Sequence, residues 1–426
     1  MSLSETTGPA VAVVSFGCRL NAQESEVVAQ QAADAGVDDV VVVNTCAVTN
    51  EAVAQARQTI RRLRRENPKR RIVVTGCAAQ TQPEMFAAMD EVDRVIGNDD
   101  KLHQESWRAT RAALDRNSLV GRDKIAVSDI MAARSSSGSS VVAPARPRAY
   151  VQIQNGCDHR CTFCIIPFGR GNSRSVAMAD VVAQVRRLVE AGNGEIVLTG
   201  VDLTSYGHDL AGTPTLGILV KALLWEISDL KRLRLSSIDS IEVDRDLFDA
   251  IAREERLMPH LHLSLQAGDD LILKRMKRRH SRADAIRFCA QVRTLRPDIT
   301  FGADIIAGFP TETEDMFARS LDLVEACDLS FVHAFPYSPR PGTPAARMPQ
   351  VASRVVKNRA RRLREAGERA LQWRLAAEVG AQRQILIESP TRGRTEHFIP
   401  VAVSGEMPGI VREMTIAGED GRTLLV

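Results

Sequence analysis

The stretch NGCDHRCTFC, residues 155–164, places Cys157, Cys161 and Cys164 on one short segment with the spacing C-x3-C-x2-C. Three thiolates at this spacing can each bind one iron of a four-iron, four-sulfur cluster, and the fourth iron then lacks a protein ligand. An open iron can bind a substrate or a cofactor, so the motif indicates chemistry as well as structure. Zinc and metal-free structural cysteines are the alternatives, although structural zinc usually has four protein ligands and His159 lies too close to complete an ordinary finger.

This segment resembles the signature of the radical S-adenosylmethionine enzymes. The resemblance implies that the amino and carboxylate groups of S-adenosylmethionine bind the open iron. It also implies that one electron from the cluster cleaves the cofactor to a 5′-deoxyadenosyl radical. Phe163 matches an aromatic position of that family, which packs near the adenine of the cofactor.

Length and composition indicate a multidomain globular protein. A chain of 426 residues is long enough for about three domains, and 44% hydrophobic with 26% charged residues is ordinary for a globular chain. No run is long and apolar enough to span a bilayer, and the N-terminus has no basic region followed by an apolar stretch. We therefore expect a cytoplasmic protein without a membrane partner, in which the eight cysteines are more typical of metal binding or catalysis than of disulfides. Cys289 and Cys327 lie on apolar helical stripes and are instead expected to pack in the core.

The net charge of +3 conceals three basic segments, at residues 57–71, 274–280 and 354–364. Each segment on its own is more often a solvated helix face than a binding site. Three such segments in a nearly neutral chain make a nucleic acid a reasonable partner.

The first hundred residues alternate between β-branched runs and helical stretches, which predicts an open parallel α/β sheet. A cysteine follows each of the expected strands 11–16, 40–43 and 72–75: Cys18, Cys46 and Cys77. Ligands bind at the carboxyl edge of such sheets, so these cysteines are expected to form one three-thiolate site although they lie far apart in sequence. The alternative is that they are three small buried residues at strand ends.

The sequences around these cysteines carry a second resemblance. SFGCRLN (15–21), VNTCAVT (43–49) and VTGC (74–77) resemble the N-terminal domain of the methylthiotransferases. The resemblance implies that Cys18, Cys46 and Cys77 bind a second four-iron cluster, which also has an open iron.

The middle of the chain repeats strand and helix about six times, which predicts a partial (β/α)6 barrel of the radical S-adenosylmethionine type. The expected strands cover residues 150–154, 195–199, 232–236, 260–265, 300–306 and 330–335. Along the strand at 260–265, His260, His262, Ser264 and Gln266 share one face, so this face is expected to point toward a polar site.

Further positions match motifs that contact the cofactor in the family. Gly194-Glu195 resembles a motif that meets the methionyl amino group, and Ser237 belongs to a segment on the ribose side. Ile306 and Gly308 belong to a late-strand segment near the adenine. Together with Phe163 and Gln266, these residues form the predicted S-adenosylmethionine site.

The C-terminal residues contain short β-prone runs between turns rich in proline and glycine, which predicts a small antiparallel β-barrel. The stretch GRTEHFIPV (393–401) resembles the TRAM domain, an RNA-binding module. The expected boundaries are an N-terminal methylthiotransferase domain at 9–110, a linker region at 111–143, a radical S-adenosylmethionine domain at 144–376 and a TRAM-like domain at 377–426.

Within the methylthiotransferases, the sequence looks most like the enzymes that modify C2 of N6-threonylcarbamoyladenosine at position 37 of tRNA. The stretches CTFCIIPF (161–168), EIVLTGV (195–201) and SYG (205–207) carry this likeness, whereas Asp239-Ser240 departs from the usual Glu-Pro and leaves the partner of Asp239 in doubt. The resemblance implies that one cluster cleaves S-adenosylmethionine and the other delivers the sulfur.

It also implies two partners, the anticodon stem-loop of a tRNA and an electron donor such as flavodoxin or ferredoxin. Sister enzymes that act on isopentenyladenosine in tRNA, or on an aspartate of a ribosomal protein, remain alternatives. A non-catalytic RNA-binding metalloprotein is a more distant alternative.

Overall fold

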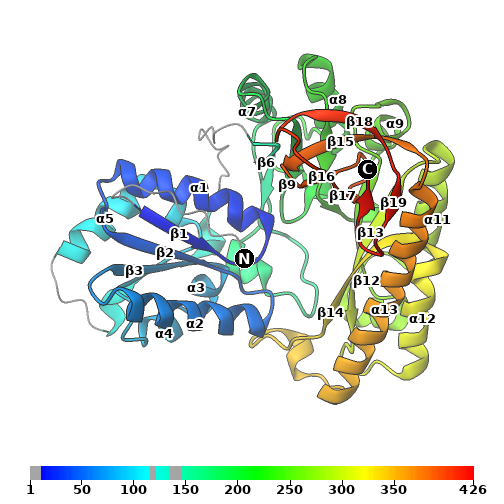
Figure 1. The fold of residues 1–426 in the computed structure, drawn as a ribbon. Helices are drawn as coiled ribbons and strands as arrows, with labels where there is room; N and C mark the ends of the chain where they lie inside the picture. Colours follow the sequence, from blue (N-terminus) through cyan, green and yellow to red (C-terminus); the bar gives the residue numbers. More distant parts are fainter. Residues whose placement is uncertain (1–10, 116–120, 135–145) are drawn as a thin grey trace.

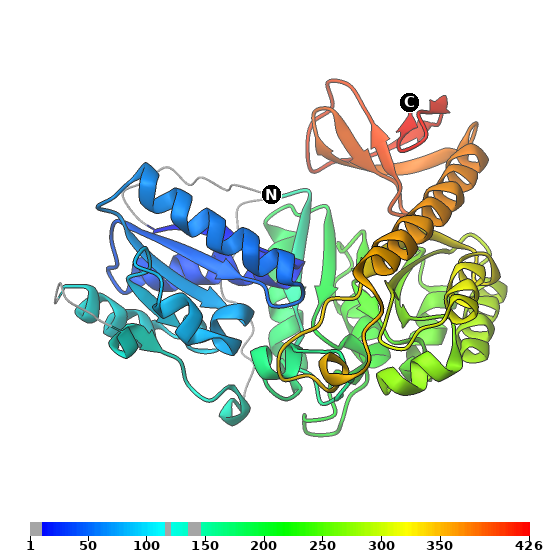
Figure 2. The same cartoon turned by 90° about the horizontal axis from the view of Figure 1, so that it is seen from below.

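The computed structural model describes residues 11–115, 121–134 and 146–426. These residues form an N-terminal α/β domain, a central barrel and a small C-terminal β-domain, drawn from blue to red in Figures 1 and 2. No helix in the described part of the chain is both long enough and apolar enough to cross a lipid bilayer.

The N-terminal domain is a five-stranded sheet in which every neighbouring pair is parallel, as predicted. The strands follow in sequence order as β1 (Val11–Ser15), β2 (Val40–Thr45), β3 (Arg71–Gly76), β4 (Arg94–Ile96) and β5 (Ile125–Ala126). Figure 1 shows helices on both faces. One face packs against α1 (Arg19–Asp34) and α5 (Gln104–Asp115), and the other against α2 (Asn50–Glu66), α3 (Cys77–Thr81) and α4 (Pro83–Ala87).

This domain extends further along the chain than the sequence predicted. The expected boundary at residue 110 falls inside α5, which continues to Asp115. Strand β5 lies within the expected linker region at 111–143, but its two residues pair with Val95 and Ile96 of β4. Part of that region therefore completes the first sheet, and the serine-rich stretch at 135–140 lies outside the described residues.

The central domain is a partial barrel of six parallel strand positions, which confirms the predicted architecture. The third position is interrupted at Ser236, so the structure divides into the sheets β10-β9-β6 and β11-β12-β13-β14. The strands are β6 (Arg148–Gln152), β9 (Glu195–Thr199), β10 (Leu233–Leu235), β11 (Ser237–Ile238), β12 (His260–Gln266), β13 (Thr300–Ala307) and β14 (Leu329–Pro336). The surrounding helices include α7 (Met178–Glu190), α8 (Leu216–Glu226), α9 (Arg245–Arg253), α10 (Asp270–Met276), α11 (Arg282–Leu295) and α12 (Glu314–Ala326).

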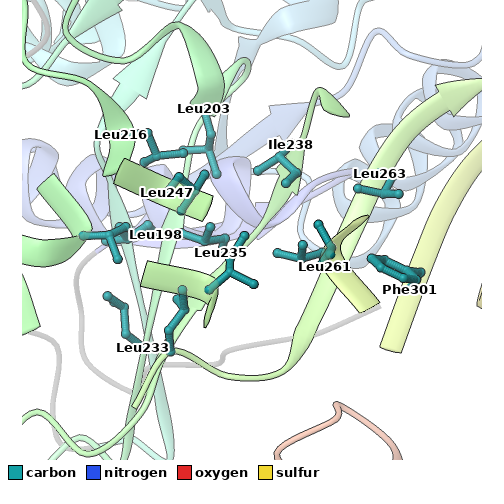
Figure 3. Close-up of a cluster of buried hydrophobic side chains, with 14 of the residues drawn as sticks. Leu198, Leu203, Leu216, Leu233, Leu235, Ile238, Leu247, Leu261, Leu263 and Phe301 are labelled. Carbon is teal, nitrogen blue, oxygen red and sulfur yellow. The ribbon is translucent and has the colours of Figure 1, made fainter. Parts of the chain in front are cut away.

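The apolar core lies between these strands and helices, as Figure 3 shows for leucines of β9, β10, β12, α8 and α9. Along β12 the leucines are buried in this core, whereas His262, Ser264 and Gln266 are only half-buried on the other face. The expected alternation of this strand is therefore confirmed, and its polar side chains are available to the barrel interior.

The long helix α13 (Ser353–Glu378) leads into a curled six-stranded sheet at the C-terminus (Figure 2). The helix ends one residue past the expected boundary at 377. The strands are β15 (Gln382–Ser389), β16 (Arg392–Arg394), β17 (Pro400–Ala402), β18 (Val411–Thr415), β19 (Gly418–Glu419) and β20 (Leu424–Leu425). Pairing is antiparallel except between β17 and β20, so the sheet is a half-barrel and not a wholly antiparallel barrel.

Candidate functional site

The cysteine loop follows β7 (Gln154–Asn155) and is held in a tight backbone arrangement. Gly156 has φ 73°, and a Cβ at this position would lie 1.9 Å from the carbonyl oxygen of Asn172, so only glycine fits there. The backbone N–H of Cys157 donates to the carbonyl of Gly171 at 3.1 Å, and that of Cys164 donates to Cys161 at 3.1 Å. These contacts turn the C-x3-C-x2-C segment back on itself.

The thiols of Cys157 and Cys164 favour their protonated form in the metal-free chain. Burial and the nearby charge of Asp202 raise the pKa of Cys157, and burial raises the pKa of Cys164 to about 12. Since metals bind the thiolate, loading this site must release protons. The Arg278 guanidinium lies beside the loop, with its Nη1 3.8 Å from Sγ of Cys161.

Asp202 is a neighbour of the loop that the sequence analysis missed. Its carboxylate lies 3.7 Å from Sγ of Cys157 and 2.8 Å from Nε2 of His159, and it accepts a 2.6 Å hydrogen bond from Ser205. The signal was present, since Asp202 follows the carboxyl end of β9 just as the N-terminal cysteines follow their strands.

Most of the predicted cofactor residues gather near the carboxyl ends of the barrel strands. Phe163 and Ile306 belong to one apolar cluster, in which the rings of Phe163 and Phe309 meet edge to face at 6.4 Å. Gln266 ends β12 with φ 67°, and Gly308 follows β13 with φ 76°. Ser237 begins β11, where it pairs in register with His262 of β12.

The predicted role of Gly194 and Glu195 is wrong, because both residues lie at the opposite end of the barrel. Glu195 begins β9, and its buried carboxylate accepts hydrogen bonds from Arg148, Arg232 and Arg234. A Cβ on Gly194 would lie 2.7 Å from the carbonyl oxygen of residue 409 in the C-terminal domain. This pair therefore joins the barrel to the C-terminal domain and is far from the cysteine loop along its strand.

The structure also identifies the partners of Asp239, which the sequence left in doubt. Its buried carboxylate accepts hydrogen bonds from Arg278 at 2.7 Å and Arg279 at 2.9 Å. Arg278 thereby connects Asp239 to the cysteine loop. The basic segment at 274–280 is thus partly committed to internal ion pairs.

The three N-terminal cysteines meet at the carboxyl edge of the first sheet, as predicted. Cys18 is exposed at the start of α1, Cys46 follows β2, and Cys77 begins α3. Gly17 touches Cys46 so closely that an added Cβ would lie 2.5 Å from its Sγ. Burial, and then the nearby thiols of Cys77 and Cys18, raise the pKa of Cys46 to about 12.

A helix from the barrel domain completes this second site. The helix α6 (Ile166–Arg170) begins two residues after Cys164, and a Cβ on Gly169 would lie 3.2 Å from the Cβ of Cys77. Asn98 joins the two segments, since its amide donates to the carbonyl of Gly169 at 2.7 Å and lies 3.7 Å from Sγ of Cys77. The two cysteine sites are thus next to each other in space.

A buried charge network lies beneath the second site. Arg170 reaches from α6 into the N-terminal domain, where it donates to Glu24 at 2.7 Å and to Asn21 at 2.6 Å. Lys101, in the short helix η1 (Asp100–Leu102), also donates to Glu24 at 2.7 Å. Burial alone would raise the pKa of Glu24, but these two cations hold it at about 2.

Arg340 supplies a direct test of whether an anionic cluster fits here. It is only 2% exposed, and Nη1 donates to Asn50, but its Nε and Nη2 have no hydrogen-bond partner among the described residues. Burial lowers the pKa of Arg340, and the sulfur of Cys46 is the negative charge that opposes this effect. Buried donors without partners are costly, so an anionic iron–sulfur cluster on the three cysteines fits this environment.

Comparison with known proteins gives consistent matches. Residues 151–324 match the Radical SAM superfamily and residues 10–97 match the uncharacterized protein family UPF0004. The threonylcarbamoyladenosine tRNA methylthiotransferase MtaB of Rickettsia prowazekii (strain Madrid E) is 49% identical over 91% of this chain and 90% of its own length. The tRNA-2-methylthio-N(6)-dimethylallyladenosine synthase of Jannaschia sp. (strain CCS1) is 34% identical over 95% of this chain and 91% of its own length.

A solved structure supports the fold. The radical S-adenosylmethionine methyltransferase TsrM from Kitasatospora setae aligns with a TM-score of 0.53 and 16% identity. The alignment covers 77% of this chain and 68% of that protein.

Proposed function

This chain belongs to the radical S-adenosylmethionine methylthiotransferase family, and from this premise we propose that it adds a methylthio group to C2 of N6-threonylcarbamoyladenosine at position 37 of tRNA. Enzymes of this family use two four-iron clusters and S-adenosylmethionine. The observation that carries the proposal is the pair of adjacent three-cysteine sites, one on the barrel and one on the first sheet. The substrate follows that named for the relative with 49% identity.

We assign one cluster to Cys157, Cys161 and Cys164. When bound, the clusters and S-adenosylmethionine supply one-electron cleavage and sulfur transfer. Arg278 places a positive charge against the thiolates of the loop, which offsets the negative charge of a loaded site. Phe163 and Ile306 offer an apolar surface on which an adenine ring can pack.

The second cluster is assigned to Cys18, Cys46 and Cys77. Arg170, Lys101 and Arg340 bring three buried cations to this side, against the one carboxylate of Glu24 in the network. This surplus of positive charge suits a site that carries three thiolates. Contact between Gly169 and Cys77 keeps the two sites together, so that a substrate held between them can reach both.

The tRNA would be bound by exposed basic residues that are not committed to ion pairs. On and just after α2, Arg65 and Lys69 are exposed and have no acidic partner among the described residues, and the same holds for Arg354, Lys357 and Arg364 on α13. Such residues bind phosphates irrespective of sequence, as an anticodon stem requires. A small one-electron donor such as flavodoxin or ferredoxin would reduce the clusters, and a tRNA substrate places the enzyme in the cytoplasm.

Mass spectrometry of tRNA nucleosides from cells with and without the gene tests this function. Loss of the methylthio form of threonylcarbamoyladenosine, with accumulation of its precursor, is the expected result. Loss of the methylthio form of isopentenyladenosine would instead reassign the substrate. An unchanged nucleoside profile would contradict a tRNA substrate and direct attention to the ribosomal-protein aspartate.

A further inference from the structure

Arg19 is an exposed cation beside the second cysteine site that has no acidic partner among the residues the structure describes. It is the first residue of α1 and directly follows Cys18. Its guanidinium makes no ion pair or hydrogen bond with any residue that the structure describes. Two aromatic rings flank it instead, with Cζ 5.8 Å from the ring centroid of Tyr150 and 5.2 Å from that of Phe398.

These two rings come from the other two domains. Tyr150 lies in β6 of the barrel, and Phe398 lies in the C-terminal domain just before β17, with φ 68°. Phe398 also stacks on His260, the first residue of β12, at 5.2 Å. Arg19 therefore lies where all three domains meet, one residue away from a predicted cluster ligand.

The other cations around Phe398 are already paired. Arg148, Arg234 and Arg394 lie with Cζ between 4.3 and 5.1 Å from the ring centroid. Arg148 and Arg234 bind Glu195, and Arg394 lies 3.2 Å from the carboxylate of residue 388.

Three of the four guanidiniums around this ring thus pair with two carboxylates, and Arg19 is the one without a carboxylate partner in the described structure. The excess positive charge around this ring also affects the pKa of Arg394. Burial lowers its pKa, and the charges of Arg148 and Arg19 lower it further. An anion bound at Arg19 would relieve this repulsion.

We propose that Arg19 binds the carboxylate of the threonyl substituent on the substrate adenine and thereby determines the choice of substrate. This inference rests on the proposed function. The threonylcarbamoyl group ends in a carboxylate, whereas a dimethylallyl group is apolar and offers a guanidinium nothing to bind. Arginine holds carboxylates through paired N–H donors, which gives both strength and orientation.

The position of Arg19 suits this role. The carbon that receives the sulfur must approach the site of Cys18, Cys46 and Cys77, and the substituent extends from the same adenine ring. The Arg19 guanidinium lies beside Tyr150 of the barrel and Phe398 of the C-terminal domain, so it can hold the substituent on the barrel side while the ring faces the cluster. The aromatic rings of Tyr150 and Phe398 attract the guanidinium and leave its N–H donors without a hydrogen-bond partner in the described structure.

Binding of anticodon stem-loops to the anaerobically reconstituted enzyme tests the proposal. Three fluorescent stem-loops differ only at position 37, which carries threonylcarbamoyladenosine, its carboxyl methyl ester or unmodified adenosine. We expect the wild type to bind the free acid about tenfold more tightly than the ester, since a charge-assisted hydrogen bond contributes at this level. Arg19→Gln should abolish this preference, and Arg19→Lys should keep part of it.

Arg65→Gln is the matched control, because Arg65 is an exposed arginine at the end of α2 without an acidic partner in the described structure. It should weaken binding of all three stem-loops equally. Iron and sulfide counts on each variant establish that both clusters are retained. If Arg19→Gln loses iron, Arg19→Lys decides the matter, and it must then discriminate acid from ester less well than the wild type.

The outcomes separate this inference from the function it rests on. A wild type that does not distinguish the three stem-loops contradicts the proposed substrate. A wild type that prefers the acid, together with an Arg19→Gln enzyme that prefers it equally, overturns the role of Arg19 alone. Equal weakening of all stem-loops by Arg19→Gln would make Arg19 a phosphate contact, which also overturns the proposal.

Discussion

Each of the two cysteine sites has three thiols, but the two sites are built in different ways. Cys157, Cys161 and Cys164 lie on one loop whose backbone is hydrogen-bonded within its own domain, from Cys164 to Cys161 and from Thr162 to Met276, each at 3.1 Å. Cys18, Cys46 and Cys77 come together because β1, β2 and β3 are parallel neighbours in register. The first site is therefore a property of a segment, and the second is a property of a folded domain.

The neighbours of the two sites also differ: those of the loop site come from its own domain, and those of the sheet site come partly from another domain. The loop has neighbours from its own barrel, including Asp202 after β9 and Arg278 after α10. The sheet site depends on another domain, since Arg170 of α6 enters it to bind Glu24 and the buried Arg340 lies near Cys46. The loop site can form within the barrel alone, whereas the sheet site is complete only after the two domains dock.

The largest expected effect comes from removing one thiol at each site. Cys161→Ala should lose about half of the iron and all cleavage of S-adenosylmethionine, because three ligands are needed to hold a cluster. Cys77→Ala should lose about the same iron but keep the cleavage, which depends on the loop site alone. Iron analysis and chromatography of 5′-deoxyadenosine measure both quantities. Equal loss of cleavage in the two variants would contradict the division of roles.

Removing one cation from the charge network at each site should destabilise the fold by different amounts. Arg170→Met leaves Glu24 buried with Lys101 as its remaining cation, and loss of a buried ion-pair partner costs about 3–5 kcal/mol. Arg278→Met should cost about 1–2 kcal/mol, because Asp239 keeps Arg279 at 2.9 Å. Denaturant midpoints of the two variants measure the difference. A larger loss in Arg278→Met would show that the loop site, and not the domain interface, carries more stability.

Acid should weaken the domain interface through Glu24. Burial works against ionisation, but Arg170 and Lys101 hold its pKa at about 2 against 4.5 for a free glutamate. A carboxyl with a lowered folded-state pKa stabilises the fold fully above its unfolded pKa and loses this contribution as the pH falls. The loss here spans pH 4.5 to about 2 and amounts to about 3 kcal/mol.

Unfolding of the metal-free chain at a series of acidic pH values measures this effect, because no cluster is then lost to acid. Glu24→Gln should flatten the acid limb of the stability curve relative to the wild type. An unchanged slope in Glu24→Gln would mean that other carboxyls, such as the buried Glu195, determine the acid sensitivity.

Much of the site followed from local sequence. Runs of β-branched residues followed by Cys18, Cys46 and Cys77 predict strands and their carboxyl ends, and parallel strands share that edge. The charge network could not be predicted in this way. Arg170 and Glu24 are 146 positions apart and meet only when two domains dock, which no local pattern encodes.

The error at Glu195 has a physical explanation. The dipeptide Gly194-Glu195 resembles a cofactor motif, but the strand was itself predicted to begin at residue 195. A residue at the amino end of a barrel strand cannot reach a site at the carboxyl edge, so these two predictions were incompatible. The strand rule held, and it also locates Asp202, which follows the same strand at its other end.

The smallest effect should come from Arg340, and it sharpens the comparison of the two sites. This buried guanidinium has two nitrogens without hydrogen-bond partners in the described structure and lies near Cys46. A cation beside a cluster stabilises its reduced form, so Arg340→Gln should lower the midpoint potential of the sheet cluster by the equivalent of about 1 kcal/mol. Redox titration followed by electron paramagnetic resonance measures the potential of each cluster in variants that keep only one. A shift confined to the loop cluster would contradict the placement of Arg340, because Cys46, which lies near its charge, belongs to the sheet site.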